Sequence, residues 1–103
     1  MNNYVWKILV PYYKDGEKCS MEHHHEWDEE VIKISNGLTV LGTNQGKWIS
    51  KCGRVFNEKM ISVEIACSRE DIKKIAKFTL KHYNQKAVYF YKISEEVHVY
   101  ESL

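Results

Sequence analysis

The chain has 103 residues and a mass of 12.2 kDa, the size of one small domain. Its 15 basic residues nearly balance its 14 acidic ones, so the net charge is +1 and no strong field attracts nucleic acid or an anionic membrane. Hydrophobic residues make up 44% of the sequence, which is too apolar for a disordered chain. We therefore expect a single domain over residues 1–103, and the length excludes a multidomain enzyme.

Cysteine spacing and the N-terminal sequence predict the compartment. The three cysteines are Cys19, Cys52 and Cys67, and without a CxxC pair they favour neither a disulfide framework nor a Cys-only zinc site. The N-terminus lacks the basic start of a secretion signal, and no apolar run approaches the roughly 20 residues that cross a bilayer. We expect a soluble, cytoplasmic protein that does not act at a membrane.

The first predicted element is a strand over residues 4–13, which is rich in aromatic and β-branched side chains. A helix is expected over residues 22–35, where apolar side chains recur at helical spacing. Ser20 is suited to cap the start of this helix, and Asn36-Gly37 is suited to end it.

Two strands joined by a hairpin are predicted in the middle of the chain. A strand over residues 38–41 resumes at residues 47–50 after a polar kink at residues 42–46. A tight turn around Gly53 then leads into a strand over residues 55–67, in which apolar and polar side chains alternate.

The last predicted elements are a helix and a strand. Ser68 begins a sequence that resembles a capping box, with Asp71 in place of the usual Glu or Gln, and the helix is expected to end near Asn84. A strand over residues 87–93 follows, with a short extension over residues 97–100 after a break.

The resulting order, βαββαβ, predicts a ferredoxin-like α+β sandwich. In that pattern both helices cover one face of a four-stranded antiparallel sheet, whose strands, numbered along the chain, lie in the order 4-1-3-2. The opposite face carries no helix, and we call it the open face. We expect the open face to be where the protein acts.

Strand alternation predicts which side chains lie on the open face. If the apolar residues of the first and third strands meet the helices, Lys7 and Glu64 point away from them on adjacent strands. The fourth strand allows two assignments: one exposes Tyr89 and Tyr91, and the other exposes Phe90 and Lys92. We favour the exposed tyrosines, because their polar tips tolerate water. The predicted binding residues of the open face are Lys7, Glu64, Tyr89 and Tyr91.

Three interpretations of this face stay open. It is an interface with another copy or another protein, a solvated sheet with a cross-strand ion pair, or a small-molecule site near Lys7, Glu64 and Tyr91. An RNA-binding sheet would carry its aromatic side chains on the central strands, and Glu64 would repel phosphate, so nucleic acid is not an expected partner.

The run His23-His24-His25 resembles a metal cluster, but successive helical residues point about 100° apart. His24 and Asp28 can hold one ion together only with help from His82 or His98. A solvated helix start explains the run better, so we predict no metal site and no cofactor.

No catalytic residue is predicted either. The acidic residues 28–30 fit a charged helix face. Cys67 precedes a helix, whose dipole is expected to lower its pKa, but no oriented histidine accompanies it in the sequence.

Four segments in a fixed order carry a resemblance to a known family. They are residues 36–40 (Asn-Gly-Leu-Thr-Val), 46–48 (Gly-Lys-Trp), 53–58 (Gly-Arg-Val-Phe-Asn-Glu) and 83–88 (Tyr-Asn-Gln-Lys-Ala-Val). This pattern resembles a bacterial domain-of-unknown-function family, which pairs Gly-Leu-Thr-Val with Gly-x-Trp, Gly-Arg…Glu and Gln-x-Ser-Val. Trp27 matches a tryptophan in the family's first helix, whereas Ala87 replaces its serine. The resemblance implies a ferredoxin-like fold, and the family has no established activity that could be carried over.

The resemblance also implies importance for Trp48, Glu58 and Gln85. Two interpretations of these residues stay open: they fix a loop over which Trp48 stacks, or they line a small pocket at that end of the sheet. In sum, we predict a small non-catalytic protein that binds through its open face, by homodimerisation or by contact with another protein. The alternatives are a small-molecule-binding protein or small enzyme using that face, and a phage or mobile-element accessory protein that inhibits a host protein.

Overall fold

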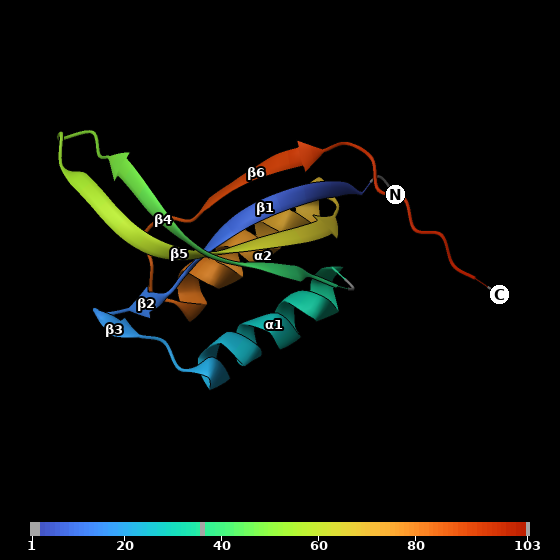
Figure 1. Cartoon of the computed structure of the whole chain (residues 1–103), viewed down its shortest axis with the longest axis horizontal. Helices are drawn as coiled ribbons and strands as arrows, with labels where there is room; N and C mark the ends of the chain where they lie inside the picture. Colours follow the sequence, from blue (N-terminus) through green and yellow to red (C-terminus); the bar gives the residue numbers. More distant parts are fainter. Residues whose placement is uncertain (1–2, 36, 103) are drawn as a thin grey trace.

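The structure, a computed structural model, describes residues 3–35 and 37–102 and consists of a sheet with two helices on one side (Figure 1). Asn36, which the sequence placed at the end of the first helix, lies outside the described residues. The elements are β1 (Tyr4–Pro11), β2 (Tyr13–Lys14), β3 (Glu17–Lys18), α1 (Met21–Ser35), β4 (Thr39–Ile49), β5 (Val55–Cys67), α2 (Arg69–His82) and β6 (Tyr89–Ser94).

The main sheet has the order β4-β5-β1-β6, and every neighbouring pair is antiparallel. The predicted α+β class, with two helices and an antiparallel sheet, is confirmed. Strands β2 and β3 form a separate two-stranded hairpin. The expected first strand over residues 4–13 was therefore too long, because β1 ends at Pro11 and Tyr13 belongs to this hairpin.

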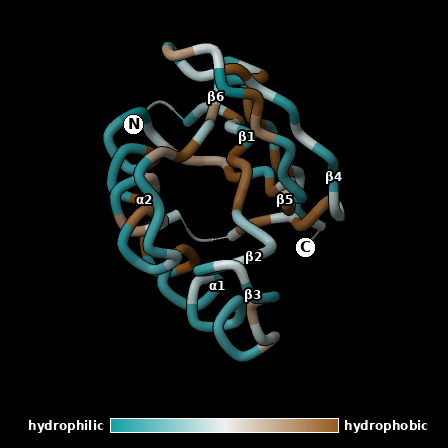
Figure 2. The backbone as a smooth tube through the Cα atoms, turned by 90° about the vertical axis from the view of Figure 1, so that its left-hand side faces the viewer, coloured by the Kyte–Doolittle hydropathy of each residue, from teal (hydrophilic) through white to brown (hydrophobic). Residues whose placement is uncertain are grey.

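The core lies between the sheet and the helices. Trp6, Ile8 and Val10 of β1 are buried, as the alternation predicted, and they pack with Trp27 of α1 and Ile72 of α2. Figure 2 shows that both helices are mostly hydrophilic along the chain, so their few apolar residues form the stripe that meets the sheet. Burying each large apolar side chain contributes roughly 1.5–3 kcal/mol.

Each buried indole N–H in this core has a partner. The Nε1 of Trp27 donates to Oγ1 of Thr79 at 2.9 Å, and that hydroxyl donates to the carbonyl oxygen of Ile75 at 2.7 Å. This chain of hydrogen bonds joins α1 to α2. The Nε1 of Trp6 donates to the carbonyl oxygen of Cys67 at 3.0 Å, which joins β1 to the end of β5.

Both predicted helix caps are confirmed. The hydroxyl of Ser20 accepts from the backbone N–H of His23 at 3.1 Å, and the hydroxyl of Ser68 accepts from that of Asp71 at 3.1 Å. These bonds satisfy N–H groups that have no partner within the first turn of a helix.

Strands β4 and β5 continue well beyond the rest of the sheet. β1 pairs only with β5 residues from Met60 to Cys67, whereas β4 and β5 stay paired as far as Ile49 and Val55. We call residues 45–49 and 55–59 the ribbon; it projects away from both helices (Figure 1). The polar kink expected over residues 42–46 is wrong, since β4 is continuous and only a register shift before Gly42 interrupts it.

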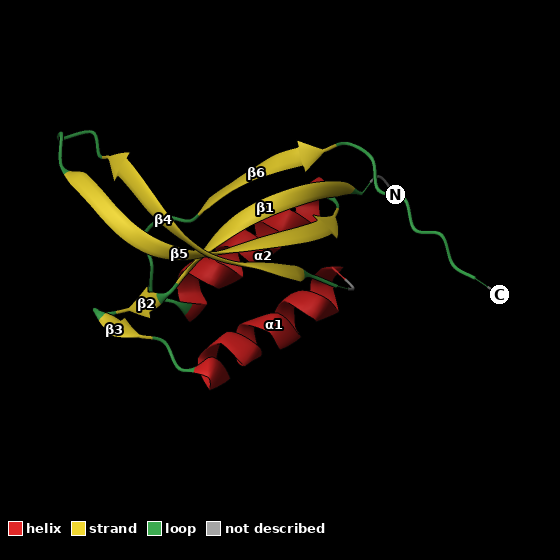
Figure 3. Cartoon of the chain, in the orientation of Figure 1, coloured by secondary structure: helices red, strands yellow, loops and turns green. Residues whose placement is uncertain are grey.

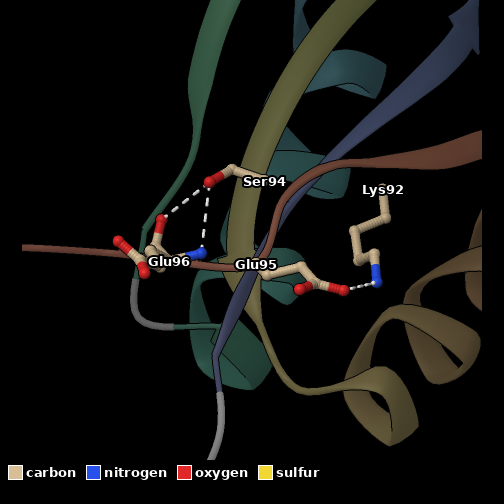
Figure 4. Close-up of polar contacts among 4 residues, drawn as sticks. All are labelled: Lys92, Ser94, Glu95 and Glu96. Carbon is tan, nitrogen blue, oxygen red and sulfur yellow. Dashed lines mark hydrogen bonds and ion pairs between the residues drawn. The ribbon is translucent and has the colours of Figure 1, made fainter.

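The chain leaves the sheet after β6. Lys92 Nζ lies 2.7 Å from a carboxylate oxygen of Glu95, and the Ser94 hydroxyl donates to the carbonyl oxygen of Glu96 at 3.0 Å and accepts from its N–H at 3.1 Å (Figure 4). These contacts form the predicted break. The strand expected over residues 97–100 is absent from the described structure, where this segment extends away from the domain (Figure 3).

Candidate functional site

Three of the predicted binding residues lie in one row across the open face. In the strand register Lys7 of β1 faces Glu64 of β5 on one side and Tyr91 of β6 on the other. Tyr89 lies two residues before Tyr91 on β6, opposite Leu9, and its ring centroid is 5.6 Å from that of Tyr91. The row therefore places an ammonium, a carboxylate and a phenol side by side.

The structure decides between the two assignments of β6. Both tyrosines are exposed, whereas Phe90 packs against the core with its ring centroid 6.2 Å from that of Trp6. Within the part of the chain that the structure describes, no ion pair joins Lys7 to Glu64. Both charged groups are half-buried and are available to a polar ligand or to a partner chain.

Apolar side chains are exposed on both faces of the ribbon, at the opposite end of β5 from the row. Trp48 is 46% exposed, Ile49 69% and Val55 64%. The Trp48 ring stacks on that of Phe56, with a centroid distance of 4.4 Å and an angle of 12° between planes, and the Arg54 guanidinium lies 5.0 Å from the Phe56 centroid. Trp48 thus stacks within the ribbon, and not over a loop pinned by Glu58 and Gln85.

Glu58 and Gln85 meet at a shallow pocket of about 260 Å³ between β5 and the β2–β3 hairpin. Asp15, one of the lining residues, accepts a hydrogen bond from the side-chain amide of Asn84 at 3.0 Å. Trp48 lies outside this pocket. The pocket is lined by Pro11, Tyr13, Asp15, Gly16, Asn57, Glu58, Lys59, Met60 and Gln85.

The histidines of α1 do not form the His24–Asp28 pair that the sequence analysis considered and rejected as a metal site. The Nδ1 of His24 accepts a hydrogen bond at 2.7 Å from the hydroxyl of Tyr83, whose pKa is raised by burial so that it keeps its proton. Burial also lowers the pKa of His24. The Nδ1 of His24 is therefore bonded to Tyr83 and not to Asp28. His98, the other suggested helper, contacts Glu96 in the C-terminal segment.

His23 meets His82 instead. The two rings stack with a centroid distance of 3.9 Å and an angle of 12°, and each Nε2 donates to the backbone carbonyl of the other residue, at 2.8 and 2.7 Å. Glu26 completes a group whose potential ligand atoms lie within 4.8 Å of one another. Sequence reasoning named His23 in the histidine run and His82 as a helper, but it did not place the two together and did not consider Glu26, because it started from the i, i+4 spacing of His24 and Asp28.

The cysteines divide by environment. Cys19 and Cys67 are buried, and burial raises the pKa of Cys67 from 9.0 to about 11. The lowered pKa that the sequence predicted from the helix dipole is therefore wrong, because desolvation of the thiolate dominates. Cys52 is exposed at the turn of the ribbon, where the hydrogen bond with the Ser50 hydroxyl lowers its pKa.

No protein-family model and no curated protein sequence matches the chain, so the predicted resemblance to a bacterial family stays a prediction. Solved structures do match. CutA from Archaeoglobus fulgidus has a TM-score of 0.67 and 8% identity over 94% of this chain and 87% of its own. CutA1 from Oryza sativa has a TM-score of 0.69 and 8% identity, and the match covers 96% of this chain and 84% of that protein. A phage SAM lyase in complex with S-methyl-5′-thioadenosine has a TM-score of 0.63 and 15% identity, and the match covers 95% of this chain and 94% of the lyase chain.

At these identities the matches show the fold alone: this chain shares the ferredoxin-like architecture of the CutA1 proteins. The Archaeoglobus protein is described as a periplasmic divalent cation tolerance protein. This finding contradicts the cytoplasmic location predicted for the chain, so widely spaced cysteines and a non-basic start do not decide its compartment. Among the described residues, no helix has the length and apolar character that a membrane crossing requires.

Proposed function

We propose that the protein is a small binding protein that associates with itself, and that a second copy covers its ribbon and its open face. The observation that carries this proposal is the ribbon, which exposes Trp48 on one face and the pair Ile49 and Val55 on the other, beyond the last residues that β1 supports. An isolated two-stranded hairpin is marginally stable in water, and exposed apolar patches are typical of interfaces.

The open face of the sheet supports the same proposal. Tyr89 and Tyr91 add exposed aromatic surface, and aromatic residues are enriched at protein interfaces. Both helices lie on the other side of the sheet, so neither of the two described helices covers the open face (Figure 1). A homodimer is the simplest assembly that covers both regions, and the two charges of the row then become available for pairing between copies.

Native mass, measured by light scattering after gel filtration, tests this proposal. We expect the wild type to elute at a multiple of 12.2 kDa and Ile49→Lys to elute as a monomer. Ile32→Lys is the matched control, because Ile32 is also an exposed isoleucine, 47% exposed, but lies on α1. A monomeric wild type, or equal effects of the two lysine substitutions, would contradict self-association through the ribbon.

A second candidate is a small polar ligand bound by Lys7, Glu64 and Tyr91. The register that aligns these three residues favours it, because a cation, an anion and an aromatic ring in one row can orient a ligand that carries both charge and a ring. The phage lyase of the same fold was solved with S-methyl-5′-thioadenosine, which therefore serves as the first probe.

Calorimetry with S-methyl-5′-thioadenosine tests the second candidate. We expect binding that Lys7→Met weakens and that Lys47→Met, an exposed lysine on the ribbon, leaves unchanged. If the wild type gives no heat of binding, or if both substitutions act equally, the row does not bind this class of ligand.

A further inference from the structure

We propose that His23, Glu26 and His82 form a binding site for a divalent transition-metal ion of the Zn²⁺ type. The site lies where the start of α1 meets the end of α2. It lies on the helix side of the molecule, so it is independent of the proposed self-association through the sheet.

The first support is the convergence of donor atoms. His23 and Glu26 are three residues apart on α1, which places them on the same side of the helix, and His82 reaches them from α2, 59 residues away in sequence. One atom from each side chain lies within 4.8 Å of the other two. Two imidazoles and one carboxylate form a donor set that Zn²⁺ accepts, with its fourth position left to water.

The second support is the nitrogen on which each ring carries its donated hydrogen. Each Nε2 donates its hydrogen to a backbone carbonyl of the other residue. A neutral imidazole with its proton on Nε2 has a free lone pair on Nδ1. Metal-binding histidines usually donate their other ring N–H to a carbonyl or carboxylate, and both rings here already do so. His24 differs, since Tyr83 already occupies its Nδ1.

The third support is access. His23 and His82 are half-buried and Glu26 is exposed, so an ion can enter from solvent without disturbing the core. Coordination by both rings requires their planes to open from the observed angle of 12°, because a metal ion lies in the plane of each imidazole that binds it. Metal binding is therefore expected to remove the stacking of the two rings.

A bound ion would join the two helices at the ends where they meet. Because the unfolded chain does not hold His82 next to His23, the ion binds the folded state preferentially and raises the melting temperature. The carbonyl bonds between His23 and His82 show that this helix contact is already formed before an ion arrives.

Zn²⁺ titration of the untagged full chain by calorimetry tests this proposal, together with NMR of the histidine rings. We expect one Zn²⁺ per chain, altered ring signals of His23 and His82, and a raised melting temperature. His82→Gln should abolish binding, and Glu26→Gln should weaken it by at least about tenfold. His25→Gln and Glu22→Gln are matched controls, since both residues are exposed on the same helix turn outside the group.

Three results would overturn the site. They are no Zn²⁺ binding by the wild type, unchanged affinity in Glu26→Gln, and equal losses in His25→Gln and His82→Gln. Circular dichroism establishes that each variant is folded. If His82→Gln is unfolded, Glu26→Gln decides, because this exposed side chain lies outside the hydrophobic core.

Discussion

The two halves of β5 share one pattern of alternation but lie in opposite environments. In the half next to β1, Val63 and Ile65 are each 1% exposed beneath the helices, whereas at the ribbon end Val55 is 64% exposed. Alternation states on which face of a sheet a side chain lies, and it does not state whether anything covers that face. The covered half is held by its own chain, whereas no helix covers the ribbon in the described structure, which is why we propose a partner there.

The largest expected difference between these regions concerns their tryptophans. Trp27→Ala empties a fully buried position and breaks the bond to Thr79, so we expect a loss of about 3–5 kcal/mol in the free energy of unfolding. Trp48→Ala, measured by urea denaturation at a concentration where the chain is monomeric, should cost less than about 1 kcal/mol. Equal losses would mean that the ribbon belongs to the core.

Thiol reactivity gives the next largest contrast. Because the pKa of Cys67 is raised to about 11 and that of Cys52 is lowered, Cys52 holds far more thiolate at pH 8. A separation of two pKa units alone predicts alkylation of Cys52 about 100-fold faster, as measured by mass spectrometry of peptides. Cys52→Ser should remove the fast phase. Fast modification of Cys67 in the folded protein would contradict the burial of that strand end.

Removal of a threonine hydroxyl is expected to give a smaller difference in unfolding free energy between the buried and the exposed region. Thr79→Val keeps the shape of the side chain but leaves the indole N–H of Trp27 without its acceptor, so we expect a loss of about 1–3 kcal/mol in unfolding free energy. Thr43→Val on the exposed side of β4 should change it by less than about 0.5 kcal/mol. Thermal melts of both variants measure the difference, and a neutral Thr79→Val would argue against the hydrogen bond.

The smallest effect is expected on the open face. Lys7→Gln should lower the unfolding free energy of the monomer by about 0.2–1 kcal/mol, because a half-exposed cross-strand charge contributes little. Urea denaturation at low and high salt measures this change. A loss of several kcal/mol would show that the row is a structural element of the fold.

Local chemistry made the elements of the fold predictable. The bounds of β5, Val55–Cys67, follow from a turn at Gly53, strict alternation and the cap at Ser68. The ribbon could not be predicted, because its projection depends on where β1 stops pairing, and that is a property of a distant segment. Pairing with β5 also kept β4 continuous through residues whose composition favours a turn.

The two candidate sites also differ in whether the sequence could predict them. The row of Lys7, Glu64 and Tyr91 was predictable, because antiparallel order and alternation together fix which residues face each other. The group at His23 was not, because its formation depends on how the end of α2 packs against the start of α1. The signal available in the sequence was His82, in the last turn of α2, and the sequence analysis had considered it as a ligand beside His24 and Asp28.

Amide hydrogen exchange along β5, followed while the protein is diluted, is the most direct test of a ribbon covered by a second copy. We predict that the amides of residues 55–59 are protected in concentrated protein and exchange rapidly once the native mass falls to that of the monomer. Those of residues 61–67 should stay protected at both concentrations, since β1 and the helices hold them. Ribbon amides that exchange at one rate across the whole dilution series would contradict the account.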